Sequence, residues 1–179
     1  MKIKTLLCAL LMLNALLLAG RAWAQDTVYW HPDRPLTWAQ FRGVPPAAPG
    51  PLAAESRCAL AYSGSARGQN GKLRFDLRVR TYFLPADSWV RPDRRTARLL
   101  AHEQLHFDIA ELYARRLHQQ FDRATFTAQN YAARSRKVFE ENWRAYQAYQ
   151  RQYDAETDHG LKTEAQARWQ ITVARALAE

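Results

Sequence analysis

Residues 99–111 read LLAHEQLHFDIAE, and their spacing predicts a helix. Leu99, His102 and His106 follow one another at intervals of three and four residues, which places them along one face of an α-helix. The same periodicity continues on both sides and predicts one long helix over about residues 93–122. Two histidines and a glutamate on a face that should turn toward the core need polar partners, because burying an unpaired polar group costs free energy.

The five residues from His102 to His106 fit the HExxH pattern of zinc enzymes. On a helix the two histidines lie one turn apart, so both imidazoles can bind the same ion. Glu103 projects roughly 60–100° away from them, which lets it contact a water on that ion rather than the ion itself. The pattern therefore predicts Zn²⁺ bound by His102 and His106, with Glu103 as the catalytic base toward the zinc-bound water.

A catalytic zinc site needs a third protein ligand and one open position. The metzincin continuation would place a glycine at 109 and a histidine at 112, but the chain has Ile109 and Leu112 there, which excludes that subclass. His31 and His118 have no neighbouring set of metal-binding residues in the predicted elements. The third ligand is therefore expected from a more distant part of the sequence.

Topology indicates where that ligand lies. A second predicted helix, residues 127–153, follows a short turn and should return antiparallel along the first. Its length brings residues 153–160, YDAETDHG, beside about residues 97–102. Asp158 in this segment is expected to cap the start of a third helix, which the pattern predicts from residue 161 onward.

Within YDAETDHG we favour His159 as the third ligand, because Gly160 lets the chain turn there and direct a side chain into a cleft. Asp154 and Glu156 are the alternatives, either as ligands or as groups that orient a ligand histidine. Tyr153 is a candidate oxyanion donor, although a tyrosine in this stripe also fits a core position.

The segment before the helices has strand-like patterns. Leu73, Phe75, Leu77, Val79 and Thr81 alternate with charged residues, which predicts a half-buried antiparallel strand. The segments TVYWH, LTWAQF and CALAYSG also look extended, and the turn-rich SARGQNG separates the last from the alternating strand. The expected fold class is α+β, with a small antiparallel sheet in the N-terminal half packed on about three helices.

Residues 1–24 have the basic start, short apolar run and A-x-A site of a secretory signal peptide. Residues 25–179 then form one expected domain with 23 basic and 17 acidic residues, a net charge of +6. Cys58 is the one cysteine left, so no internal disulfide is expected, and it suits a small core position. We expect a periplasmic or secreted protein without a membrane anchor after cleavage. With no aromatic-basic motif, we expect no nucleic-acid partner.

The chain resembles the bacterial family of predicted secreted zinc-dependent proteases, catalogued as a domain of unknown function. The resemblance rests on LTWAQFRGVPP, SWV, LLAHEQLHFDIAELYARRL and YDAETDHGLKTEAQARW, in that order across about residues 36–169. It implies an exported, zincin-like metalloprotease domain with His102, Glu103 and His106 in their usual roles. It does not supply a substrate.

These observations lead to the hypothesis of an exported zinc-dependent hydrolase, a peptidase acting on a peptide or protein of the cell envelope. The alternative is a non-catalytic envelope protein whose zinc site is structural, or whose cleft only binds peptides or cell-wall fragments.

Overall fold

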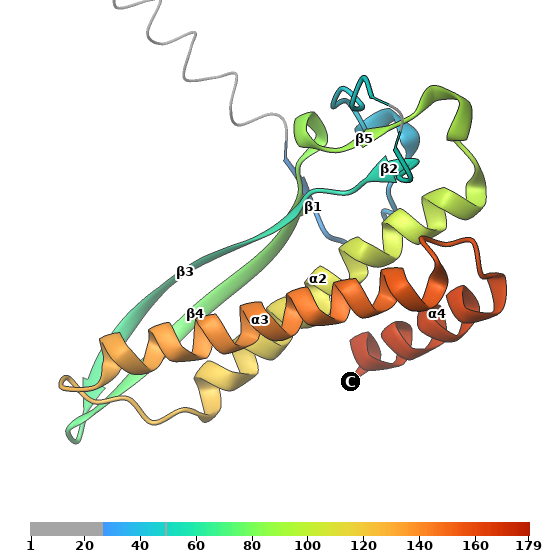
Figure 1. The fold of residues 1–179 in the computed structure, drawn as a ribbon. Helices are drawn as coiled ribbons and strands as arrows, with labels where there is room; N and C mark the ends of the chain where they lie inside the picture. Colours follow the sequence, from blue (N-terminus) through green and yellow to red (C-terminus); the bar gives the residue numbers. More distant parts are fainter. Residues whose placement is uncertain (1–26, 49) are drawn as a thin grey trace, which may run out of the picture.

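The computed structural model describes residues 27–48 and 50–179, so the expected signal segment 1–24 lies outside the described residues. The fold is α+β, as predicted, with three long helices and a small antiparallel sheet (Figure 1). The strands are β1 (Val28–Tyr29), β2 (Ala54–Glu55), β3 (Cys58–Gln69), β4 (Lys72–Phe83) and β5 (Trp89–Val90), and the helices are α2 (Ala97–Arg123), α3 (Tyr131–Thr157) and α4 (Thr163–Ala178).

Strands β3 and β4 form a long hairpin with twelve residues in each strand. Asn70 and Gly71 make the turn with φ of 50° and 71°, the left-handed conformation that a two-residue hairpin turn requires. The expected break at SARGQNG is therefore too wide, since residues 65–69 pair with residues 72–76 across the hairpin. In β4 the predicted alternation is confirmed: its charged residues are exposed and the intervening side chains are buried or half-buried.

The sheet has the order β1–β4–β3, and a separate short ladder joins β2 to β5. The prediction that LTWAQF is extended is wrong, because Trp38–Gln40 form a 3-10 turn. The side chain of Gln40 accepts a hydrogen bond from the backbone of Thr37 at 2.6 Å, which stabilises this turn locally. Phe41, which follows this turn, lies in the core, where its ring centroid is 5.0 Å from that of Phe83.

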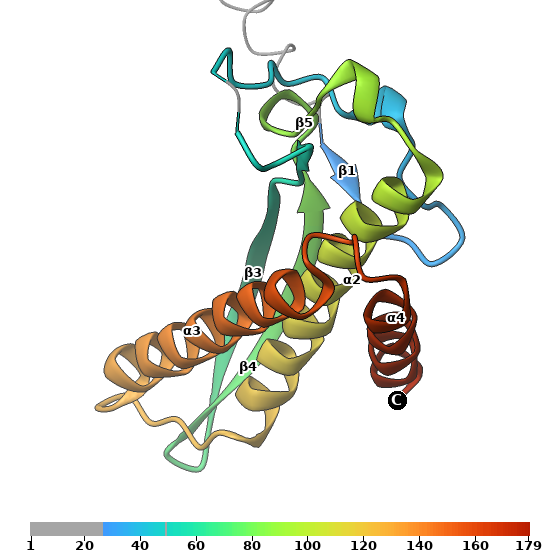
Figure 2. The ribbon, with the colours of Figure 1, turned by 45° about the vertical axis from the view of Figure 1, so that its right-hand side comes forward.

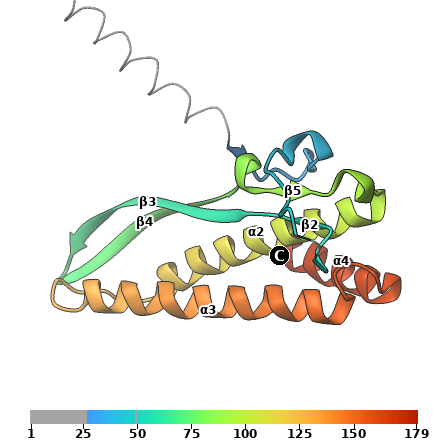
Figure 3. The same ribbon diagram turned by 45° about the horizontal axis from the view of Figure 1, so that its top comes forward.

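Helix α2 is the central element of the molecule. It lies between the β3–β4 hairpin and the antiparallel helix α3, and α4 packs beside both helices (Figures 2 and 3). Its residues enter all three clusters of buried apolar side chains: Ile109 faces α3 and α4, Phe107 faces the sheet, and Leu117 faces the hairpin. None of the helices in the described part of the chain combines the length and the apolar character that crossing a membrane requires.

The connection from α3 to α4 is unusually constrained. Asp158, His159 and Gly160 all have positive φ values, of 51°, 51° and 81°. Asp158 ends α3 as its left-handed C-cap, so the expectation that it caps the next helix is wrong; Lys162 precedes α4 instead. A positive φ is costly for residues with a side chain, so packing against the rest of the fold must stabilise this turn.

Candidate metal centre

Helices α2 and α3 bring two histidines and a carboxylate together. The Nε2 atoms of His102 and His106 are 3.1 Å apart, and they lie 3.2 Å and 3.1 Å from Oδ1 of Asp154. These three atoms form a nearly equilateral triangle. Ligands bound tetrahedrally to a metal ion at 2.0–2.1 Å are separated by about 3.3 Å, so the triangle is of a size that could hold one metal ion.

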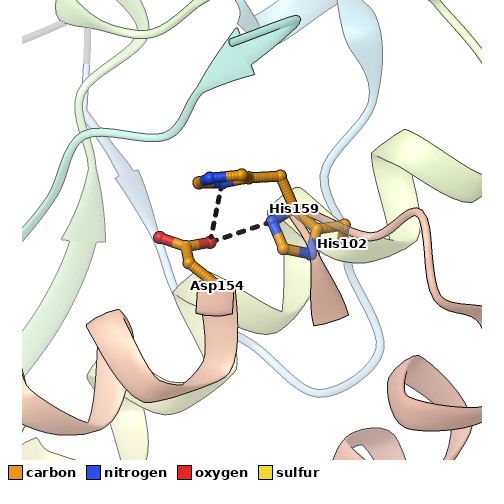
Figure 4. A group of neighbouring side chains, drawn as sticks. All are labelled: His102, Asp154 and His159. Atoms are coloured by element: carbon orange, nitrogen blue, oxygen red, sulfur yellow. Dashed lines mark ion pairs between the residues drawn. The ribbon is translucent and has the colours of Figure 1, made fainter. Parts of the chain in front are cut away.

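His159 approaches the same carboxylate from the turn after α3, and its Nδ1 lies 3.5 Å from Oδ1 of Asp154. Figure 4 shows the Asp154 carboxylate facing the imidazoles of both His102 and His159, a group that could hold a metal ion. The His159 side chain is 48% exposed, against 2% for His102, so it sits at the rim of the site. Of the sequence candidates, Asp154 contacts both helical histidines, and His159 contacts Asp154 and lies near His102.

Glu156 does not reach them. Its carboxylate accepts hydrogen bonds from Gln152 at 2.8 Å and from the indole of Trp169 at 2.7 Å, on another face of α3. These contacts lower the pKa of the carboxyl below its ordinary value. Two residues along a helix correspond to about 200° of rotation, which explains why Asp154 and Glu156 point in different directions.

The other nitrogen of each helical histidine contacts a glutamine oxygen. His106 Nδ1 lies 2.6 Å from Gln150 Oε1, and His102 Nδ1 lies 3.3 Å from Gln166 Oε1. The amide nitrogen of Gln150 donates to the backbone oxygen of His106 at 3.0 Å, which fixes which way this amide points. Because the oxygen of this fixed amide only accepts, Nδ1 of His106 should carry the proton, which leaves the Nε2 atom of His106 available to bind a metal ion.

Tyr153 supports this arrangement from the core. Its ring stacks on His102 with centroids 4.6 Å apart, and the residue is fully buried. Its hydroxyl donates to Gln166 Oε1 at 2.8 Å and lies 3.2 Å from the backbone oxygen of His102. A hydroxyl held in this way faces the protein interior, which fits the core position that the sequence also allowed for Tyr153.

Gly160 allows the turn to approach His102 closely. A Cβ atom on residue 160 would lie 2.9 Å from Cβ of His102 and 3.0 Å from its Cγ, closer than real Cβ contacts. The positive φ of 81° also favours glycine at this position. The expected importance of Gly160 thus has two physical causes, the backbone conformation and the space occupied by the imidazole.

Charges within the cluster are tightly coupled. Burial alone would raise the pKa of Asp154, but its contacts with His102 and His106 outweigh that effect and lower it. Burial alone would lower the pKa of His106, but Asp154 and Glu103 raise it above the ordinary value. Oδ1 of Asp154 is itself buried without an aligned hydrogen-bond donor among the described residues. A cation bound between these groups would satisfy that oxygen.

Glu103 lies next to this cluster and is only 3% exposed. Its Oε2 accepts a hydrogen bond of 2.6 Å from the hydroxyl of Ser56, in the segment between β2 and β3. Glu103 lines a cavity of about 710 Å³, and so do the two helical histidines. Residues 50–59 form one wall of this cavity, and α2, α3 and the turn after α3 form the others.

Sequence reasoning did not single out Ser56, Gln150 or Gln166. Gln150 lies one helical turn before Asp154, so the spacing of α3 could have placed it on the same face. Ser56 directly follows β2, which pairs with β5, and two-residue strands such as these have no usable sequence signal. Gln166 depends on how α4 docks, which its own sequence does not specify.

The remaining candidates lie elsewhere. His118 is exposed and contacts Asp122 at 3.2 Å, and His31 lies 3.8 Å from Asp33. Neither approaches the cluster, in agreement with the sequence interpretation. Cys58 is half-buried and packs against two of the apolar clusters, and burial raises the pKa of its thiol well above the ordinary value.

A family model described as a bacterial protein of unknown function (DUF922) matches residues 72–160. The matched segment runs from the start of β4 to Gly160 and includes His102, Glu103, His106 and Asp154. No curated protein and no solved structure is found to match the chain. The match thus supports the resemblance to a bacterial domain of unknown function, and it carries no information about a metal or a reaction.

Proposed function

We propose that this protein is a zinc-dependent hydrolase, and specifically a peptidase with a zincin-like site. The observation that carries the proposal is the convergence of two Nε2 atoms on Oδ1 of Asp154, with both Nδ1 atoms held by glutamines. Two neutral imidazoles and one carboxylate are a common zinc donor set in catalytic sites. We assign His102, His106 and Asp154 as the ligands, and His159 as a rim residue that adjoins them.

Zinc bound there would act as a Lewis acid and would make a water nucleophilic near neutral pH. Glu103 is placed beside the triangle but makes no contact with it in the described structure, so its carboxylate is available as a general base. It would take the proton from the attacking water and return it to the departing amine. The hydrogen bond from Ser56 occupies one carboxylate oxygen and leaves the other free for this proton.

A peptide is the substrate class that suits the shape of the cavity. Residues 50–59 include the start of an edge strand, and α2 and α3 form the facing walls. An extended peptide could lie along this segment, with its backbone near the triangle. The proposal places the protein in the periplasm or outside the cell, in line with the signal-like segment at residues 1–24.

The alternative is a structural zinc site in a non-catalytic envelope protein. Structural sites are closed by four protein ligands and need no base. Here the triangle borders an open cavity, and a buried carboxylate that is not a ligand lies beside it. Those two features favour catalysis over a structural role.

Replacing Glu103 with glutamine tests the enzyme hypothesis. We expect Glu103→Gln and the wild-type protein each to bind one zinc per chain, and we expect Glu103→Gln to lose peptide hydrolysis by about 10²–10⁴-fold, because the general base is removed. Zinc is measured by elemental analysis, and hydrolysis by mass spectrometry of a mixed peptide library. Glu111→Gln is the matched control, because Glu111 lies on the same helix and pairs with Arg115 at 2.9 Å.

Unchanged hydrolysis in Glu103→Gln would contradict the enzyme proposal. Wild-type protein that binds zinc but cleaves nothing in the library would support the structural-site alternative. If the wild-type protein has no affinity for zinc, both the zinc-hydrolase proposal and the structural-site alternative are wrong.

A further inference from the structure

The cavity has a surplus of positive charge. Five arginines line it, together with three acidic residues, and two of those acids, Glu103 and Asp154, already belong to the proposed zinc site. A divalent cation in that site would balance their two charges. The five arginines are Arg57, Arg91, Arg94, Arg98 and Arg151.

Three of these arginines have local partners. Arg57 lies 3.6 Å from Glu55, and Arg94 lies 3.4 Å from Asp93. Arg91 donates to the backbone oxygens of Leu52 and Ala48, each at 3.1 Å, and so holds the loop that forms one wall. Two of the three arginines are thus neutralised by carboxylates, and the third holds a loop through backbone carbonyls.

Arg98 and Arg151 differ from them. Within residues 27–48 and 50–179, neither has a carboxylate within 4 Å. Arg98 precedes His102 by four residues on α2, and Arg151 precedes Asp154 by three residues on α3. Residues at these spacings are neighbours on a helix surface, so each arginine lies about one turn from a residue of the triangle. The two helices are antiparallel (Figure 3), so Arg98 and Arg151 lie on opposite sides of the triangle along the helix axes.

The position of Arg98 is also unfavourable for the helix itself. It is the second residue of α2, whose first turn contains no acidic residue. The N-terminus of a helix has a partial positive charge, so a cation there is destabilising and an anion is stabilising. An anionic ligand beside Arg98 would interact favourably with both the guanidinium and the helix terminus.

The cavity is long enough for a peptide segment. On α3 it extends from Trp143 to Asp154, both of which line it. Eleven residues of helix correspond to about 16 Å, or about five residues of extended peptide. A ligand of this length can place a carboxylate near an arginine while its backbone lies at the triangle.

We infer that the site is specific for peptides that carry a carboxylate next to the metal centre, recognised by Arg98 and Arg151. This inference rests on the proposed function, since it identifies the substrate class of the same site. The carboxylate can be an acidic side chain or the C-terminus of the peptide, and the experiment distinguishes these two sources.

The test measures binding and not turnover. Zinc-loaded Glu103→Gln is titrated with three fluorescent hexapeptides of otherwise identical sequence. The first has two central glutamates and an amidated C-terminus, the second has glutamines in their place, and the third has the glutamines with a free C-terminal carboxylate. Fluorescence anisotropy at low and high salt gives the dissociation constants, and the zinc content of each sample is measured in parallel.

We expect one of the two carboxylate peptides to bind about tenfold more tightly than the neutral peptide at low salt, because each arginine–carboxylate pair contributes a few-fold. Salt should reduce the difference. The double variant Arg98→Ala/Arg151→Ala should lose this difference in affinity between carboxylate and neutral peptides. The double variant Arg95→Ala/Arg144→Ala should retain the difference. These control arginines are exposed on the same part of the chain but do not line the cavity.

Equal binding of all three peptides to zinc-loaded protein, or no binding at all, would overturn the inference and leave the zinc site intact. A preference that survives the Arg98 and Arg151 substitutions would also overturn it. Failure of the proposed function is seen separately, as absent zinc or as full hydrolysis by Glu103→Gln.

Discussion

The two ends of the α2–α3 helix pair are built from opposite kinds of side chain. Where α2 begins and α3 ends, buried histidines, glutamines and carboxylates meet beside a cavity. Where α2 ends and α3 begins, Phe121, Phe126 and Phe139 pack with Phe75 of the hairpin. The same antiparallel pairing thus supports a polar cluster at one end and an aromatic core at the other.

This difference indicates that the two ends of the helix pair have different roles, one in stability and one in the proposed metal site. An aromatic core stabilises the fold without any ligand, whereas a buried polar cluster is stable only if every group finds a partner. At the polar end that requirement holds the histidines in one orientation. Substitutions at the aromatic end should therefore change stability alone, and those at the polar end should change metal binding or catalysis.

The largest effect on stability is expected at the aromatic end. Phe126 is 1% exposed, and its ring lies 4.6 Å from that of Phe75. Phe126→Ala should lower the free energy of unfolding by about 3–5 kcal/mol, because it leaves a cavity in the core. Urea denaturation of the metal-free protein measures this, with the exposed Tyr131→Ala as the control. A matching loss of zinc affinity in the folded variant would show that the two ends are coupled.

An intermediate effect is expected from the glutamine that holds His106. Gln150→Leu removes the contact with Nδ1 of that histidine and should weaken zinc binding by about 10–100-fold, as loss of a ligand's outer partner does. Competition with a zinc chelator measures the affinity. Gln147→Leu is the control, since Gln147 lines the same cavity one turn earlier on α3. Equal zinc affinities in these two variants would mean that Gln150 does not orient the ligand.

The smallest effect is expected at Ser56. Its hydroxyl contacts Glu103 at 2.6 Å, but the residue is only half-buried, so water can replace the hydroxyl in part. Ser56→Ala should reduce hydrolysis by about three- to tenfold with unchanged zinc affinity. The rate is followed with the best-cleaved peptide of the library. Weaker zinc binding in Ser56→Ala would instead place this serine in the support of the metal site.

Much of the fold was predictable, because the decisive patterns are local and periodic. The three-and-four spacing around His102 gave the long helix, and the alternation around Leu77 gave the central strand. The length of the second helix predicted that it runs back antiparallel along α2. The contact between Gln150 of α3 and His106 of α2 agrees with that prediction. The turn segment Trp38–Gln40 was mispredicted as extended, since its conformation depends on one side chain to backbone hydrogen bond.

The candidate site was predictable only in outline. Helical spacing places His102 and His106 together, but it cannot rank Asp154 against His159. That ranking depends on where the turn after α3 places His159, and the three consecutive positive φ values of this turn have no periodic sequence signal. Likewise, Tyr153 fits an active-site role in sequence, and only its contacts with Gln166 and His102 assign it to the core.

The central claim is that Asp154 completes a zinc site with the two histidines of α2. The most direct test is zinc affinity, measured by chelator competition, for the wild-type protein, Asp154→Asn and His159→Ala, with the exposed Asp158→Asn as the control. We predict one tightly bound zinc in the wild type and the control, at least a ~100-fold weaker affinity in Asp154→Asn, and a decrease of less than about tenfold in His159→Ala. Full affinity in Asp154→Asn together with loss of zinc in His159→Ala would contradict this account.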